Sequence, residues 1–182
     1  HSKFEKSLDG KTIAMQINPI LNAAGFPFSM LPIPIVYMSG DRAGNVDNIV
    51  FHFDGDTCTM SWDEGDEHNT ILCGMDGKAR TSPIKLAGMN FTAFSTAAWL
   101  DENTLEVHMR PVGGICMRKI KLNFNGHIVT LRPSSQMPMS AMAESLALDV
   151  DSFFPPILQR FGLVAFDQLP GIIDAPILGR IK

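Results

Sequence analysis

Cysteine is scarce in this sequence of 182 residues, which excludes a disulfide-rich scaffold. The three cysteines are Cys58, Cys73 and Cys116. Their spacing is irregular, and no two of them stand in the C-x-x-C arrangement of a zinc site. We therefore expect buried free thiols, although the count still allows one disulfide. No metal site is predicted.

Long uninterrupted apolar runs are absent as well. The longest apolar stretch, 23–38, is cut by Pro27, Pro32 and Pro34. It is also shorter than the roughly 20 apolar residues that a membrane-spanning helix needs. We therefore predict no membrane-spanning segment.

Positive charge is not in excess. The net charge is −4 at pH 7 and the pI is near 5.7, so the composition indicates no basic surface and no nucleic-acid partner. The chain opens with His1 rather than methionine, which we interpret either as a remnant of cloning or as a cut inside a longer protein. Because a targeting signal could have been removed with the missing part, the sequence predicts no compartment.

A complete catalytic motif is lacking too. Ser82-Pro83-Ile84-Lys85 matches S-x-x-K, in which the lysine must face the serine from the next turn of a helix. Here the flanking residues predict strand and loop, and the only tyrosine, Tyr37, is not followed by x-Asn. We predict no catalytic residue in this chain. The alternative is an enzyme whose site is assembled from distant residues.

Histidines and acids show no metal-binding spacing. His52, His68, His108 and His127 stand in neither H-x-H nor H-x-x-x-H arrangement, which favours solvated side chains. The acidic run 63–67 lacks the alternating oxygen ligands and closing glutamate of a calcium loop. It predicts a solvated hairpin tip, and no cofactor is predicted anywhere.

Short segments rich in Ile, Val, Thr and Phe, separated by Gly, Asn and Asp, predict strands. The first strand is expected over 12–17, followed by a short helix over 18–25 and an extended segment over 35–38. Asp54-Gly55 and Asn125-Gly126 are typical two-residue hairpin turns, in which both central residues have positive φ.

The residues from 94 to 132 allow the strand register to be tested, because directly opposed residues share a face. Turns at Glu102-Asn103, Gly113-Gly114 and Asn125-Gly126 pair apolar residues with apolar residues, for example Val107 with Ile120 and Leu122 with Val129. Four consecutive strands then obey one inside/outside rule, which predicts a meander with one wet face. The expected inner residues are Phe94, Ala98, Leu100, Leu105, Val107, Met109, Ile120, Leu122, Val129 and Leu131.

A meander of this length must curl or close to protect its edges. The predicted fold is therefore mainly β: an antiparallel up-and-down meander that closes into a lipocalin-like barrel over 1–133. A β-sandwich is the alternative. Residues 134–182 predict a short helical or irregular C-terminal extension, packed on the barrel or on a neighbouring domain.

Arg118 is the one residue that the sequence singles out as a ligand-binding candidate. The register places it opposite Met109 and Pro133, on the apolar face. A buried arginine needs an anionic partner, because an unpaired buried charge is very costly. An internal salt bridge, a position at the barrel mouth that lets the side chain reach water, or an anchor for an anionic ligand would each satisfy it.

Two stretches carry a family resemblance. Residues 99–107 read WLDENTLEV and are followed by Arg110-Pro111, and residues 120–131 read IKLNFNGHIVTL. Over 45–133 the chain resembles the lipocalin-like β domain found C-terminal to bacterial serine hydrolases of the class C β-lactamase and penicillin-binding-protein superfamily. The resemblance implies that the catalytic elements lie in a different domain of the same polypeptide.

Two main functions follow as hypotheses. The first, implied by the resemblance, is a non-catalytic accessory domain that packs on, or shapes access to, the catalytic domain of a larger serine hydrolase. The alternative is a stand-alone lipocalin-like carrier of a small amphipathic or apolar ligand.

Overall fold

The computed structural model describes residues 2–16, 46–86, 88–112, 117–135 and 176–182. These residues form ten strands and one short helix, in regions where the sequence alternates apolar and polar side chains with a period of two. The elements are α1 Glu5–Leu8, β1 Thr12–Met15, β2 Val46–Asp54, β3 Thr57–Glu64, β4 Glu67–Gly74, β5 Arg80–Leu86, β6 Met89–Trp99, β7 Thr104–Pro111, β8 Arg118–Asn125, β9 Ile128–Ser135 and β10 Ile177–Ile181.

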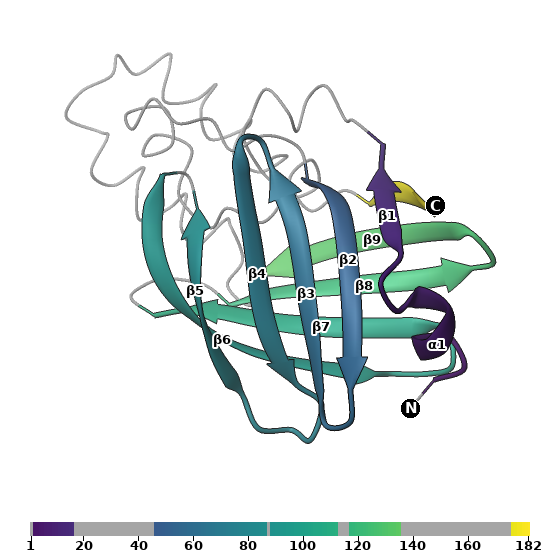
Figure 1. Ribbon diagram of the computed structural model, residues 1–182, viewed down its shortest axis with the longest axis horizontal. Coiled ribbons are helices and arrows are strands. Elements are labelled where there is room, and N and C mark those ends of the chain that lie inside the picture. Colours follow the sequence, from purple (N-terminus) through teal and green to yellow (C-terminus); the bar gives the residue numbers. More distant parts are fainter. Residues whose placement is uncertain (1, 17–45, 87, 113–116, 136–175) are drawn as a thin grey trace, which may run out of the picture.

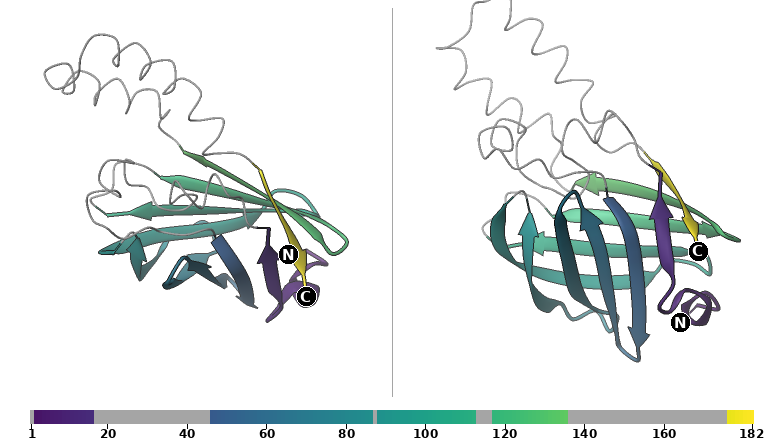
Figure 2. Two further views of the ribbon diagram at one scale, coloured as in Figure 1. Left: turned by 90° about the horizontal axis from the view of Figure 1, so that it is seen from above. Right: turned by 45° about the horizontal axis from the view of Figure 1, so that its top comes forward.

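The strands form one sheet of order β4-β3-β2-β1-β10-β9-β8-β7-β6-β5. Strands that follow each other in the chain are neighbours in this order, except β4 and β5, which stand at its two ends. The pairing of β1 with β10 joins the two ends of the described chain. Figures 1 and 2 show the result as two layers, with β2–β4 crossing over β6–β9. The predicted antiparallel, up-and-down, lipocalin-like barrel is confirmed.

The last strand comes from the segment that was predicted to pack on the barrel or on a neighbour. β10 lies between β1 and β9, with Ile181 opposite Ile13 and Ile177 opposite Leu131. The barrel therefore includes residues from both predicted parts of the chain, 1–133 and 134–182. The helical part predicted for the C-terminal extension, the helix over 18–25, the extended segment 35–38 and Cys116 lie outside the described residues.

The barrel closes at a seam between β4 and β5, which do not pair through a backbone ladder. Asn69 of β4 joins them instead: its Nδ2 donates to the Lys85 carbonyl and its Oδ1 accepts from the Lys85 amide, both at 2.7 Å. The Leu72 amide donates to Ser82 Oγ at 2.8 Å. Side chains thus satisfy backbone groups that a missing ladder would leave buried and unpaired.

The interior is apolar, as the alternation predicts. Strand β3 shows the pattern clearly, with Cys58, Met60 and Trp62 buried and the residues between them half-buried. Of the ten residues predicted to face inward between positions 94 and 131, seven are fully buried. These are Leu105, Val107, Met109, Ile120, Leu122, Val129 and Leu131.

The other three expected inner residues face outward, and that prediction is wrong. In β6, Ala97 rather than Ala98 lies opposite Val107, so Phe94 is 45% exposed and Leu100 is 52% exposed. The cause is the β6–β7 connection. It has four residues, closed by a hydrogen bond from the Leu100 amide to the Thr104 carbonyl (2.9 Å), and it shifts the register by one.

The hairpins at Gly55 and Gly126 form where predicted, but with a different turn. Asp54 pairs with Thr57 and Asn125 pairs with Ile128, so each loop begins at its glycine. Gly55 and Gly126 have φ of +54° and +61°, whereas the residues after them do not have positive φ, as in a type II′ turn. Leu122 therefore lies opposite Leu131 instead of Val129. This shift of two leaves every side chain on its predicted face.

One end of the barrel is filled by aromatic rings. Phe4, which precedes α1, stacks on Phe124 with ring centroids 5.7 Å apart, and Phe124 contacts Trp99 at 5.8 Å. Phe53 links Trp99 to Phe51 at 6.2 and 5.9 Å. The N-terminal segment therefore helps to close this end of the interior.

The register makes a direct prediction for neighbouring residues of β9. Val129 is fully buried, whereas Ile128 is 55% exposed. We expect Val129→Asp to lower the free energy of unfolding by about 3 kcal/mol or more, because the carboxylate would be buried without a partner. Ile128→Asp should change it by less than about 0.5 kcal/mol. Urea denaturation of both variants measures this, and equal losses would contradict the register.

The seam makes a second prediction. Asn69→Ala leaves the amide and carbonyl of Lys85 without their partner, which should cost about 1–3 kcal/mol. Asn123→Ala is the matched control, because Asn123 Nδ2 bonds only the hydroxyl of Thr104 (3.0 Å) on the exposed side. Denaturation together with hydrogen exchange in β4 and β5 would measure both. The seam assignment fails if the two variants lose the same stability.

Candidate functional site

Arg118 lies on the inner face of the barrel, as predicted. It is the first residue of β8, it lies opposite Met109, and only 2% of its surface is exposed. Its partner position on β9 is Ser135 rather than Pro133. With so little surface exposed, the guanidinium is enclosed by protein and does not extend into water, which removes the barrel-mouth alternative.

A polar hydroxyl shares the row of Arg118 across the sheet. Ser95 of β6 lies opposite Met109, which in turn lies opposite Arg118, so all three project inward at one level. Ser95 is 1% exposed, and its Oγ has no hydrogen-bond partner within the described part of the chain. A buried hydroxyl in that state usually binds water or a ligand.

The neighbours of Ser95 on the inner face are small. Ala93 and Ala97 flank it along β6, and both are buried. Three small side chains in succession fill less of the interior than Val107, Met109 and Pro111 on the facing positions of β7. Sequence reasoning missed this stretch because the predicted register of β6 was wrong by one residue.

A buried acid was also missed. Glu64, the last residue of β3, is 0% exposed, and its Oε2 accepts a hydrogen bond from Trp62 Nε1 at 3.4 Å. The acidic run 63–67 was predicted to be a solvated tip, which is wrong for Glu64. The alternation of β3 decides its place, because Trp62 and Glu64 lie two residues apart and share the inner face. The described interior therefore contains one acidic residue, Glu64 on β3, and one basic residue, Arg118 on β8.

The rest of the acidic run is tied to its surroundings. Asp63 accepts hydrogen bonds from His68 (2.7 Å) and Asn48 (2.8 Å), and Glu67 accepts one from the Gly88 amide (2.6 Å). The bond with His68 lowers the pKa of Asp63, although partial burial opposes it. Only the turn itself, 65–66, is a solvated tip.

Ser82 and Lys85 do not meet. They lie three residues apart on strand β5, which places them on opposite faces. Ser82 is 6% exposed and accepts its bond from Leu72, whereas Lys85 is exposed. The prediction that this S-x-x-K match lies on a strand rather than a helix is confirmed, and the lysine cannot activate the serine.

The histidines are dispersed over the outside. His52 lies 3.5 Å from Asp9, and His108 lies 2.6 Å from Glu106. His127 occupies the exposed β8–β9 turn. Within the described ranges no three His, Cys, Asp or Glu side chains come together in a way that could hold a metal ion.

Two cysteines face each other on neighbouring strands. Cys58 of β3 lies directly opposite Cys73 of β4, and both are buried free thiols. Their mutual hydrogen bond and their burial raise the pKa of Cys73. Because the thiolate is the reactive form, these thiols act as core side chains.

Comparisons with known proteins leave the function open. No family model matches the chain, and no curated protein matches it. Among the described residues, no helix has the length and apolar character required to cross a bilayer.

Several solved structures are similar in outline. A fatty-acid-binding protein of Schistosoma mansoni, in complex with arachidonic acid, is 14% identical with a TM-score of 0.46; the match covers 74% of this chain and 91% of that one. One from Drosophila melanogaster brain is 16% identical (TM-score 0.44, 72% and 93% covered). One from Manduca sexta is also 16% identical (0.44, 71% and 90%). Because these sequence identities and TM-scores are low, the function has to be argued from the chain's own residues.

The Asp63–His68 contact predicts a pH effect. A carboxyl whose pKa is lower in the folded state contributes stability above its unfolded pKa, here near 3.8, and loses it as the pH falls through the folded value. We expect Asp63→Asn to melt below the wild type at pH 6, and the gap to narrow by pH 2.5. Melting curves across this range measure it, and a gap independent of pH would contradict the assignment.

Proposed function

We propose that this chain is a lipocalin-like carrier that binds a small amphipathic anion inside the barrel. The ligand's apolar part packs against the inner face, and its acid group lies near Arg118. The observation that carries the proposal is an enclosed guanidinium in a mainly apolar interior, in one row with a buried serine hydroxyl that lacks a partner in the described residues.

The inner face suits an apolar chain. Met109 lies opposite Arg118, and Ile120 and Leu122 follow it on the inner face of β8; all three are fully buried. Contact with such side chains stabilises a bound hydrocarbon by about 25 cal/mol for each Å² removed from water. The small residues of β6 leave the adjoining inner surface less crowded than that of β7.

The polar groups suit one acid group. A guanidinium has five N–H donors in a planar fork that fits a carboxylate in bidentate fashion, so a protein partner and a ligand can share it. Ser95 Oγ adds a further donor in the same row. The described residues bury no second Lys or Arg that could pair with another anionic group. The preferred ligand therefore has a single anionic end.

The accessory-domain hypothesis stays a prediction, and the comparisons gave it no support. The described residues do not favour an enzyme either, because Ser82 and Lys85 lie on opposite faces of β5. A barrel with an enclosed cation is better suited to holding a ligand than to activating a nucleophile.

Binding of cis-parinaric acid, a fluorescent long-chain carboxylate, tests the proposal. We expect the wild type to bind it and Arg118→Leu to bind at least tenfold more weakly, while remaining as stable as the wild type or more so, because a buried charge has been removed. Arg132→Leu is the matched control: Arg132 is exposed on the outer face of β9, so the affinity should not change.

The methyl ester of the same chain separates charge from hydrophobicity. It should bind the wild type and Arg118→Leu equally, because it has no anion for the guanidinium. Absence of wild-type binding to the acid would refute the carrier function. Equal affinities of the Arg118 and Arg132 variants for the acid would refute the role of Arg118.

A further inference from the structure

The outer face of β7–β10 concentrates positive charge. Alternation places six of the fifteen Lys and Arg of the chain there, but only one of its nineteen acids, Glu106. The overall charge of −4 predicted no basic surface, and that expectation is wrong for this face. Its cations, which we name the basic face, are Arg110, Lys119, Lys121, Arg132, Arg180 and Lys182.

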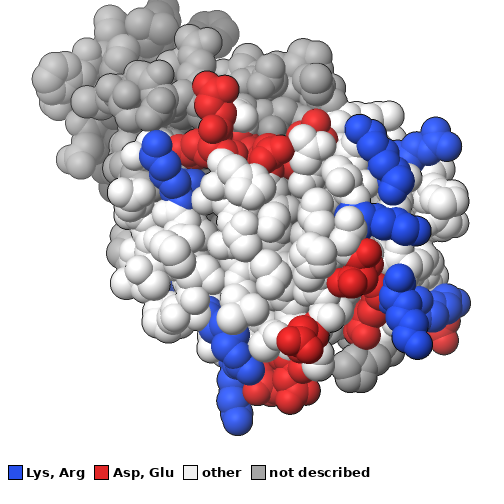
Figure 3. All heavy atoms as spheres, in the orientation of Figure 1, with Lys and Arg blue, Asp and Glu red and all other residues white. Residues whose placement is uncertain are grey.

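The opposite layer has no such charge. Strands β2, β3 and β4 contain no Lys or Arg. Figure 3 views that layer: its centre is uncharged, and blue side chains gather at the edge where Figure 1 places β1 and the C-terminus. Of these two layers, positive charge is thus concentrated on β7–β10, although other cations lie at the N-terminus and on the β5 side.

Internal pairing does not explain the basic face. Lys121 lies directly opposite Arg132, an arrangement of like charges that destabilises a sheet. Glu106 is already engaged, at 3.2 Å from Lys121 and 2.6 Å from His108. Within the described part of the chain, no ion pair includes Arg110, Arg132, Arg180 or Lys182. Cations placed against one another in this way fit an external partner of opposite charge.

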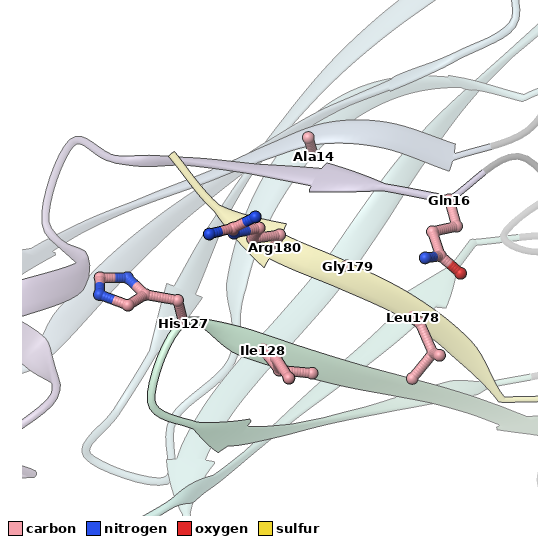
Figure 4. Close-up of a pocket in the computed structure, with 7 residues that line it drawn as sticks. All are labelled: Ala14, Gln16, His127, Ile128, Leu178, Gly179 and Arg180. Atoms are coloured by element: carbon pink, nitrogen blue, oxygen red, sulfur yellow. The ribbon is translucent and has the colours of Figure 1, made fainter.

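Apolar side chains lie among these cations. Ile128 and Leu178 are 55% and 46% exposed, and they border a half-open groove of about 480 Å³ where β1, β10 and β9 adjoin. Figure 4 shows His127 and Arg180 toward one end of the groove and Gln16 at the other. The lining is mainly apolar with a cation at its side, as in a surface that contacts both phosphate and hydrocarbon.

We propose that the basic face docks on the surface of an anionic lipid bilayer. Lys and Arg side chains contact lipid phosphates, and Ile128 and Leu178 enter the headgroup layer. Binding to single-stranded nucleic acid would need successive exposed aromatic rings for stacking. The outer positions of β7–β10 in the described residues have none, and only Phe94 of β6 lies next to them, opposite Arg110. This docking does not depend on the ligand-carrier function.

Co-sedimentation with vesicles tests the docking. At about 0.1 M salt, where exposed charges still act over about 10 Å, we expect the wild type to bind vesicles of phosphatidylcholine with 30% phosphatidylglycerol and not pure phosphatidylcholine. Arg132→Glu combined with Arg180→Glu should reduce the bound fraction at least tenfold. Lys78→Glu with Lys85→Glu changes the net charge equally, but on the β5 side, and should leave binding unchanged.

Two further variants separate the contribution of the exposed apolar side chains to vesicle binding from any contribution of the barrel interior. Ile128→Ser with Leu178→Ser should weaken vesicle binding without changing its dependence on salt. Arg118→Leu should bind vesicles as the wild type does, because Arg118 lies inside the barrel. Vesicle binding therefore tests the docking proposal independently, and it is expected even if the chain does not bind cis-parinaric acid.

Three outcomes would overturn the docking proposal. One is wild-type binding that is equal on neutral and anionic vesicles, and another is an equal loss in the two charge-reversal variants. The third is binding to a short DNA duplex that Arg132→Glu with Arg180→Glu abolishes, with no binding to vesicles. That result would assign the basic face to nucleic acid instead.

Discussion

The pairing of β1 with β10 is the interaction on which the barrel depends. Without it the meander would end in two exposed edges, each with unpaired backbone groups. The contact is close because β10 carries a glycine at its centre: a Cβ at Gly179 would lie only 2.5 Å from Met15 Sδ and 3.1 Å from the Ala14 carbonyl oxygen. Two segments of five residues or fewer therefore close this side of the barrel.

The opposite closure, between β4 and β5, is of a different kind. Gly74 meets Thr96 of β6 in a single parallel pairing, and the rest of the seam is spanned by side chains such as Asn69. A ladder distributes closure over many equivalent bonds, whereas this seam rests on a few specific ones. The barrel thus combines one backbone closure with one that individual side chains hold.

Charge, too, differs between parts of the barrel: the interior and the outer face of β7–β10 each carry it in a different arrangement. The interior holds Arg118 and Glu64 among apolar side chains, where each must be compensated, because a buried charge is very costly to leave unpaired. Outside, six cations gather on the outer face of β7–β10, and two of them, Lys121 and Arg132, lie directly opposite each other. An anionic amphipath inside would share the guanidinium of Arg118 with its protein partner, and an anionic surface outside would offset the repulsion between the outer cations. Both proposals rest on the same physical reasoning, yet they concern opposite faces of the same strands.

The sequence by itself determined which residues pair between β7 and β8. The alternation in β7 and β8 placed Val107 opposite Ile120 and Arg118 on the inner face, since a short hairpin constrains its own register. At the β8–β9 hairpin an error of two residues was harmless to the faces, whereas at β6–β7 an error of one reversed them. The tertiary structure alone decided the place of β10 and the gathering of cations from β7, β8, β9 and β10. These features join residues far apart in the chain, and no local pattern fixes which distant strands become neighbours.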